Sequence, residues 1–201
     1  MTTLTRRSAL ALGAAAVAAP FVATLPARAA DPDWFPVDAW TQVLSTQPIA
    51  SYWKHLRDAA RVGKEFGSTD AVWRSFFRVP VASLAGTTIR SVAFEILLTH
   101  SPTPNPTPVQ LFHVQDIDPE VPLAWNTQPG WIAYLGTASG ASYGSQLDQV
   151  LTFGGLQPLV EEALAREATH LSFGLRAGNE RDQYQWKKFT GDRAGLTVTR
   201  V

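Results

Sequence analysis

Aromatic side chains with polar neighbours are the residues of this chain best suited to contact a ligand. Trp131 and Tyr134 lie in one such segment, and Tyr184 and Trp186 lie in another. A flat ring can stack on the apolar C–H face of a sugar, while nearby amide, Asn or Lys groups bind its hydroxyls. The candidate glycan-binding residues are therefore Trp131, Tyr134, Asn179, Tyr184, Trp186 and Lys188.

The competing interpretation of these aromatic residues is structural, because buried Trp and Tyr are common at strand edges without any ligand. On this interpretation Trp73 and Trp125 belong to the core, and Trp73 lies on the apolar face of its predicted strand. For Tyr184 and Trp186, which would share one strand face with Lys188, both interpretations stay open.

Two short acidic clusters could supply oxygen ligands to calcium, which takes about six to eight of them. Asp116 and Asp118 form the first cluster, and Glu180 and Asp182 form the second. Neither has the spacing of an EF-hand loop, so solvated turn residues are the alternative. Calcium is the one cofactor that the sequence suggests, and no other is expected.

No group of residues predicts a catalytic site. The four histidines show no metal-ligand spacing, and none adjoins a Gly-x-Ser-x-Gly nucleophile motif. A glycosidase needs two carboxylates about 5–10 Å apart. Glu95 could meet Asp148 or Glu180 in a folded domain, but any two acids could do so. We therefore predict no catalytic residues.

The first 29 residues are typical of a cleavable export signal. Arg6 and Arg7 precede a short Ala-rich apolar run over residues 10–22, and small residues at Ala27 and Ala29 form a cleavage site. The run is shorter than the roughly 20 residues of a membrane span. The paired arginines favour the twin-arginine route, and the general secretory route is the alternative.

Residues 30–201 are long enough for a single domain with its own core. Without the signal, the chain has fourteen basic and seventeen acidic side chains, a net charge of −3. This charge disfavours a nucleic-acid partner, which needs a basic surface. The chain has no cysteine. The core must therefore hold the domain together without disulfides.

Segments with a two-residue hydrophobic period dominate the rest of the chain and predict β-strands. One segment differs, because its apolar residues repeat at helical spacing from Leu156 to Leu164 and Pro158 suits a first turn. The predicted fold is all-β: a jelly-roll-like β-sandwich with one short α-helix near residues 156–167. The sequence predicts strands over residues 40–44, 60–62, 72–81, 89–99, 109–114, 150–153, 171–175 and 184–189 and near the C-terminus, and loops over residues 63–70, 101–108 and 136–145.

Several segments, taken in order, resemble the DNRLRE-domain family, which includes carbohydrate-binding module family 96. Members of this family are secreted β-sandwiches. The chain has no counterpart of the cysteine pair that several relatives carry, and the nearest match to the string that names the family is residues 179–182. The resemblance rests on residues 48–52, 61–63, 74–79, 84–86, 91–94 and 108–112, the Trp-Asn-x-Gln-Pro-Gly corner at 125–130, and a late strand at 173–176.

The resemblance and the aromatic residues together imply a secreted, extracellular, non-catalytic polysaccharide-binding module that stands alone. Its expected partner is a polysaccharide or cell-wall glycan, with no membrane contact after signal cleavage, and we expect a monomer. One alternative is an extracellular structural or protein-interaction sandwich. A second alternative is a small polysaccharide-degrading enzyme.

Overall fold

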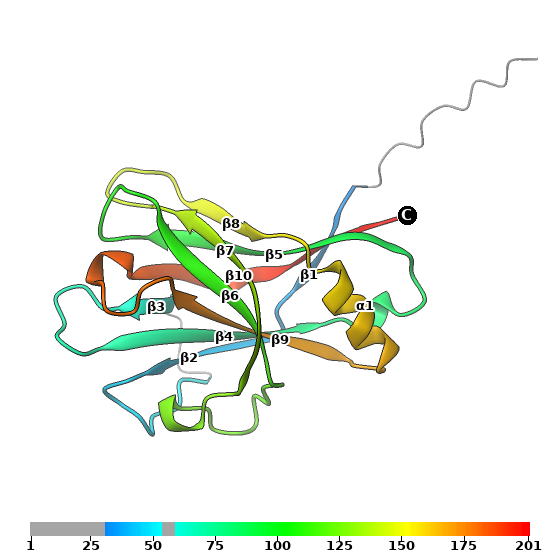
Figure 1. The fold of residues 1–201 in the computed structure, drawn as a ribbon, viewed down its shortest axis with the longest axis horizontal. Helices are drawn as coiled ribbons and strands as arrows, with labels where there is room; N and C mark the ends of the chain where they lie inside the picture. Colours follow the sequence, from blue (N-terminus) through cyan, green and yellow to red (C-terminus); the bar gives the residue numbers. More distant parts are fainter. Residues whose placement is uncertain (1–30, 54–58) are drawn as a thin grey trace, which may run out of the picture.

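The computed structural model describes residues 31–53 and 59–201. The expected signal peptide, residues 1–29, lies outside this part of the chain. The described residues form ten antiparallel strands, one α-helix and three short 3₁₀ helices (Figure 1). The elements are β1 Asp33–Pro36, β2 Ala39–Leu44, β3 Ala60–Lys64, β4 Val72–Pro80, η1 Ala82–Leu84, β5 Ile89–His100, β6 Thr107–Val114, η2 Trp125–Thr127, β7 Trp131–Gly140, β8 Gln149–Phe153, α1 Gln157–Ala165, β9 His170–Ala177, η3 Gln183–Gln185 and β10 Lys187–Arg200.

The strands form two facing sheets, as the sequence predicted. Sheet A contains β1, β10, β5 and β8, and sheet B contains β2, β4, β9, β6 and β7. Strand β3 joins the two sheets. Its first residues pair with β10, whereas Gly63 and Lys64 pair with β4. The all-β sandwich prediction is therefore confirmed.

Gly63 is the residue at which β3 passes from one sheet to the other. Its φ is +88°, a value that side chains other than glycine rarely adopt. A Cβ at this position would lie 2.9 Å from the Cβ of Ala177 and 3.2 Å from the carbonyl oxygen of Gln185. Both the backbone conformation and the close packing therefore require glycine here.

The main core fills the space between the sheets. Phe77 of β4, Phe94 of β5 and Phe173 of β9 are fully buried there, and the rings of Phe94 and Phe173 lie 5.1 Å apart. Burying one such side chain contributes about 1.5–3 kcal/mol. Alternate residues of the same strands point to the outer faces, and on sheet B the outward Phe76 and Phe112 belong to a second buried cluster with Ile117 and Leu123.

The helix α1 connects β8 to β9 and covers one end of the sandwich (Figure 1). Pro158 lies in its first turn, and Val160 and Ala163 point into the core. The backbone N–H of Leu156 donates to the carbonyl of Val92 on β5 (3.1 Å), which fixes the start of the helix. The predicted helix near residues 156–167 is confirmed.

Two predicted segments differ most from the structure. Residues 136–145 were expected to be a loop, but residues up to Gly140 belong to β7, which also contains Trp131 and Tyr134. Here main-chain pairing with β6 outweighs a composition rich in small residues. The segment 184–189 was expected to be one strand, but Tyr184 lies in η3 and β10 begins at Lys187. The Asp182 side chain accepts from the Tyr184 backbone N–H (2.9 Å) and so caps this turn.

Candidate ligand-binding face

The outer side of sheet B carries a row of aromatic rings that crosses the strands, and the rings of Phe76 and Phe112 in this row are buried. Phe76 of β4, Gly174 of β9, Phe112 of β6 and Tyr134 of β7 occupy paired positions in the register. The ring of Trp131 fills the space over Gly174 and contacts both Phe76 and Phe112, at ring-centre distances of 5.5 and 5.0 Å. The Tyr134 ring lies 5.5 Å from that of Phe112 and extends the row.

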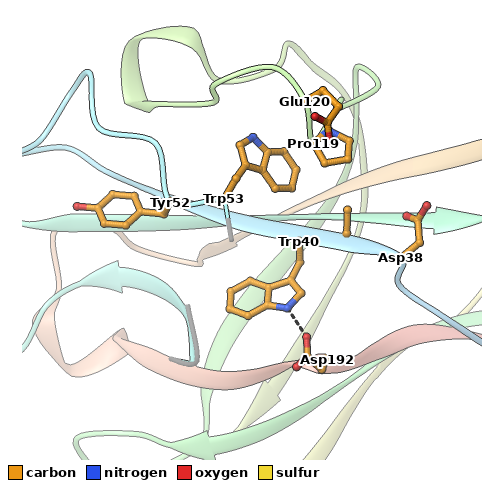
Figure 2. Close-up of a pocket in the computed structure, with 8 residues that line it drawn as sticks. Asp38, Trp40, Tyr52, Trp53, Pro119, Glu120 and Asp192 are labelled. Carbon is orange, nitrogen blue, oxygen red and sulfur yellow. Dashed lines mark hydrogen bonds between the residues drawn. The ribbon is translucent and has the colours of Figure 1, made fainter. Parts of the chain in front are cut away.

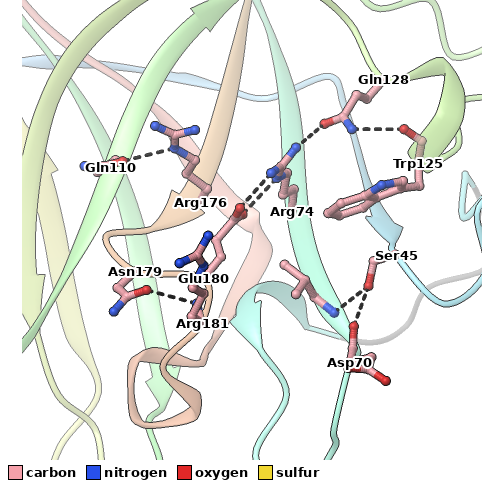
Figure 3. A network of polar contacts seen from close by, with 11 residues as sticks. Ser45, Asp70, Arg74, Gln110, Trp125, Gln128, Arg176, Asn179, Glu180 and Arg181 are labelled. Atoms are coloured by element: carbon pink, nitrogen blue, oxygen red, sulfur yellow. Dashed lines mark hydrogen bonds and ion pairs between the residues drawn. The ribbon is translucent and has the colours of Figure 1, made fainter.

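A second row, of polar side chains, lies beside the aromatic one. Arg74 lies two residues before Phe76 on β4, Arg176 lies two residues after Gly174 on the antiparallel β9, and Gln110 pairs with Arg176 in the register. Gln110 Oε1 accepts from Nε of Arg176 at 3.0 Å (Figure 3). Strand alternation places both rows on the same outer face, because their members are separated by an even number of residues.

The two arginines stack on the aromatic rings. The guanidinium of Arg74 lies 4.5 Å from the ring centre of Trp125 and 5.5 Å from that of Trp131. The guanidinium of Arg176 lies 4.4 Å from the ring centre of Phe112 and 5.6 Å from that of Trp131. Trp131 is therefore flanked by two cations. We refer to Arg74, Gln110, Phe112, Trp125, Trp131, Tyr134 and Arg176 as the aromatic–arginine face.

The two arginines differ in their charge balance. Arg74 forms a two-pronged ion pair with Glu180 at 2.6 and 2.8 Å and also donates to Gln128 at 2.9 Å (Figure 3). Arg176 has no carboxylate partner among the residues that the structure describes, and its side chain is half-buried. The aromatic–arginine face therefore keeps one uncompensated positive charge beside Trp131.

The structure brings together some of the residues that the sequence singled out. Trp131 and Tyr134 both contact Phe112, and Tyr134 is 57% exposed. Asn179 lies beside Glu180 in the loop after β9, where its side chain accepts from the backbone N–H of Arg181 (3.0 Å; Figure 3). Trp131 and Tyr134 therefore belong to the aromatic–arginine face. Asn179 lies outside this face, in the loop from which Glu180 pairs with Arg74.

The other three predicted glycan contacts do not form a shared platform. Trp186 is only 7% exposed, and its ring packs edge-on against His100 at 5.3 Å. Lys188 lies over the same ring, with Nζ 5.0 Å from its centre. Tyr184 is exposed and instead packs against Phe66. The expectation that Tyr184, Trp186 and Lys188 line one strand face is therefore wrong, because the chain turns at η3.

The acidic residues considered for calcium have other roles in the structure. Glu180 pairs with Arg74, and Asp182 caps η3. Asp118 accepts from the backbone N–H of Glu120 at 2.9 Å, and Asp116 is exposed in the loop after β6. Within residues 31–53 and 59–201, no group of three or more His, Asp or Glu side chains could hold a metal ion. The geometry gives the calcium prediction no support.

A separate hollow of about 420 Å³ lies at the open edge between the sheets (Figure 2). Trp40 donates its indole N–H to Asp192 at 2.6 Å, and Asp38 pairs with Arg78 at 2.8 Å and with His170 at 3.2 Å. Burial alone would raise the pKa of Asp38, but the hydrogen bonds and charge of Arg78, together with His170, hold it below its usual value. The hollow is lined by Asp38, Ala39, Trp40, Tyr52, Trp53, Pro119, Glu120 and Asp192.

The sequence did not identify Arg74, Arg176 and Gln110 as ligand contacts. The alternation of Arg74 and Phe76 on one strand face was visible, as was that of Gly174 and Arg176 on another. Their meeting depends on the pairing of β4, β9 and β6, which are far apart in the chain. An arginine and an aromatic residue two positions apart on a predicted strand were the one available signal.

Within the described residues, no helix combines the length and the apolar character that a bilayer crossing requires. The chain matches no protein-family model, and no curated protein sequence matches it.

Proposed function

We propose that this chain is a secreted, non-catalytic polysaccharide-binding module and that the aromatic–arginine face binds the glycan. The observation that carries the proposal is the half-buried Trp131 ring, which is flanked by two guanidinium groups and lies beside the same Phe112 ring as the exposed Tyr134. A sugar ring presents apolar C–H groups on its faces and hydroxyls around its edge. The partly exposed rings of Trp125, Trp131 and Tyr134 can contact the C–H groups, and the Arg, Gln and Tyr polar groups can bind the hydroxyls.

The charge of the face favours an acidic polysaccharide. Arg176 has two terminal nitrogens with no partner among the described residues, and Arg74 is already paired with Glu180. A guanidinium binds a carboxylate or sulfate with two parallel hydrogen bonds. Stacking and a few such contacts correspond to micromolar to millimolar affinity, about −4 to −8 kcal/mol.

The hollow in Figure 2 is the strongest alternative location for a function, because it combines carboxylates with aromatic residues. A glycosidase needs one carboxylic acid that stays protonated near neutral pH, which requires a raised pKa. The pKa of Asp38 is shifted in the opposite direction by Arg78 and His170, despite its burial. Asp192 accepts the Trp40 N–H. The partners of Asp38 therefore favour its ionised form, which supports binding over hydrolysis.

Affinity electrophoresis tests the proposal directly. The protein from Asp31 to Val201 should be retarded in gels that contain polygalacturonate, alginate or dextran sulfate. Fully methyl-esterified polygalacturonate is the matched ligand control, because its backbone is the same and its charge is removed. We expect weaker retardation in the esterified gel, and in added salt, because the Arg176 contact is electrostatic.

Variants locate the site. Trp131→Ala and Arg176→Gln should each reduce retardation, whereas Arg90→Gln should not, since Arg90 is an exposed arginine on β5 of the other sheet. Circular dichroism melting would check that each variant is folded. If the unaltered protein migrates equally in all acidic gels and in a blank gel, or if Arg90→Gln has the same effect as Arg176→Gln, the proposed function is wrong.

A further inference from the structure

The outer face of sheet A carries an exposed tryptophan, on the side of the sandwich away from the aromatic–arginine face. Trp34 of β1 is 45% exposed, whereas its neighbour Phe35 packs against the main core. The indole lies against the main chain of Gly195 on β10, where a Cβ would be only 2.8 Å from ring atom Cζ2. Gly195 therefore allows the ring to rest against the sheet while much of it remains in solvent.

A shallow hollow of about 350 Å³ begins at this ring and runs across the sheet. Its position follows from the register: Glu95 of β5 pairs with Gly195, and Leu97 pairs with Val150 of β8. Val150 is 52% exposed. The hollow thus has an aromatic wall and an aliphatic floor with Glu95 between them. It is lined by Trp34, Glu95, Leu97, Val150, Asp192 and Arg193.

The charged side chains of this hollow are available to a ligand. Neither Glu95 nor Arg193 has a hydrogen bond or ion pair among the described residues. Asp192 accepts the Trp40 N–H through one oxygen only. Two acids against one base make the hollow slightly negative, in contrast to the positive aromatic–arginine face. An acidic glycan would therefore be repelled here.

A ligand for this hollow needs both an apolar surface and several hydroxyl groups, without negative charge. Packing a purely apolar partner here would bury the Glu95 charge without a partner, which is costly. Sugar hydroxyls can donate to Glu95 and accept from Arg193 while the C–H face of the ring covers Trp34 and Val150. The volume lies within the range of ordinary small-ligand sites.

We propose that the hollow around Trp34, Glu95 and Arg193 is a second saccharide site, which binds a neutral glycan. It rests on different residues from the proposed acidic-glycan site and lies on the opposite sheet. The two sites can therefore succeed or fail separately. If both exist, one molecule can hold two glycans of different charge at the same time.

Affinity electrophoresis in gels that contain laminarin, xyloglucan or galactomannan tests the second site. The unaltered protein should be retarded in at least one of the three. Trp34→Ala should weaken binding in that gel by about five- to tenfold, the scale of a lost aromatic stacking contact. Trp34→Phe should restore part of it. Tyr143→Ala is the matched control, because Tyr143 is 46% exposed but lies in the loop after β7.

Retardation in polygalacturonate separates the two proposals, since Trp34→Ala should leave it unchanged and Trp131→Ala should leave neutral-glycan binding unchanged. The second site is ruled out if no neutral gel retards the protein, or if Trp34→Ala and Tyr143→Ala have equal effects. Sedimentation velocity tests the alternative that a second copy of the chain occupies the hollow. If the protein is a dimer that Trp34→Ala dissociates, the hollow is a contact between two copies and the saccharide proposal is wrong.

Discussion

The ring of Trp131 lies in a space that exists only because residue 174 has no side chain. A Cβ at Gly174 would lie 2.8 Å from ring atom Cζ3 of Trp131 and 2.9 Å from Cγ1 of Val114. Contacts under 3 Å between carbon atoms are strongly repulsive. Gly174 therefore sets the height of the tryptophan over sheet B, and with it the spacing between the ring and the two arginines.

Gly174→Ala should displace the Trp131 ring and weaken retardation in polygalacturonate. We expect a loss of about 1–3 kcal/mol in the free energy of unfolding, as for other overpacking substitutions. Gly154→Ala is the control, because a Cβ at Gly154 meets no atom within 4 Å. Urea unfolding and affinity electrophoresis measure the two effects. Equal results for both variants would show that Trp131 does not depend on Gly174.

Glu180→Gln should strengthen the binding of acidic glycans. The substitution removes the charge that neutralises Arg74, so the aromatic–arginine face gains a second free cation. The ion pair is partly buried, with side-chain exposures of 18% and 21%. Its loss should lower stability by on the order of 1–2 kcal/mol. Retardation in polygalacturonate at low and high salt checks the binding effect, which should shrink as salt rises. Weaker binding at low salt would mean that Glu180 positions Arg74 for the ligand.

Trp186→Ala should destabilise the domain by about 3–5 kcal/mol, the range for truncating a buried large side chain. Trp186 is buried beside Leu44, Ala71 and Trp73. Tyr184→Ala, at a neighbouring position that is 50% exposed, should cost less than about 1 kcal/mol. Urea denaturation of the two variants measures both values. A small loss for Trp186→Ala would return this residue to the list of glycan contacts.

Stability should rise with pH between pH 7 and 9.5 because of Lys187. Its side chain is fully buried, and Nζ donates to Thr107 Oγ1 at 2.6 Å and to the carbonyl of Gly140 at 2.9 Å. Burial lowers its pKa from 10.5 to about 8. Between these two values the unfolded chain binds a proton that the folded protein does not, so folding is favoured as pH rises. The expected gain is about 2 kcal/mol.

Urea unfolding midpoints at pH 7, 8, 9 and 9.5 measure this dependence. The series stops there because burial raises the pKa of Tyr52 above 10, which acts in the opposite direction at higher pH. Lys187→Met is the control, since it fills a similar volume without a titrating group. The rise should disappear in this variant, whatever its absolute stability. A rise that persists in Lys187→Met would assign the effect to other groups.

Export should depend on the paired arginines if the twin-arginine route is used. Secreted protein should begin at Ala30 or Asp31, and replacing Arg6 and Arg7 together with lysine should leave the precursor inside the cell. N-terminal sequencing of protein from the medium gives the cleavage site. Export that continues in the double variant would favour the general secretory route, and secreted protein that still begins at Met1 would rule out a cleaved signal.

The sequence predicted the all-β class and most strands because inward residues such as Phe94 and Phe173 alternate with polar or small neighbours. Trp73 was correctly predicted to be buried for the same reason. Trp186 was harder, because a single 3₁₀ turn between Tyr184 and Lys187 changes which way its side chain points. Local periodicity cannot show such a turn.

The candidate site was less predictable than the fold. Trp131 and Tyr134, which the sequence singled out in one segment, both contact Phe112, but the guanidinium groups beside Trp131 come from strands distant in sequence. Cross-strand distances depend on sheet order, and sheet order follows from the packing of the whole core. A single sequence contains the pattern of each strand but not the order of the strands.

Strand β3 has a consequence for how the chain folds. Within this short strand, Gly63 pairs with Trp73 and Val62 pairs with Lys187. The two partner residues are separated in the sequence by more than half of the domain. Proteins dominated by such non-local pairings fold slowly, on a scale of about milliseconds to seconds. The early and late parts of the chain must therefore meet before either sheet is complete, and a chain that is still missing β10 cannot yet close the sandwich.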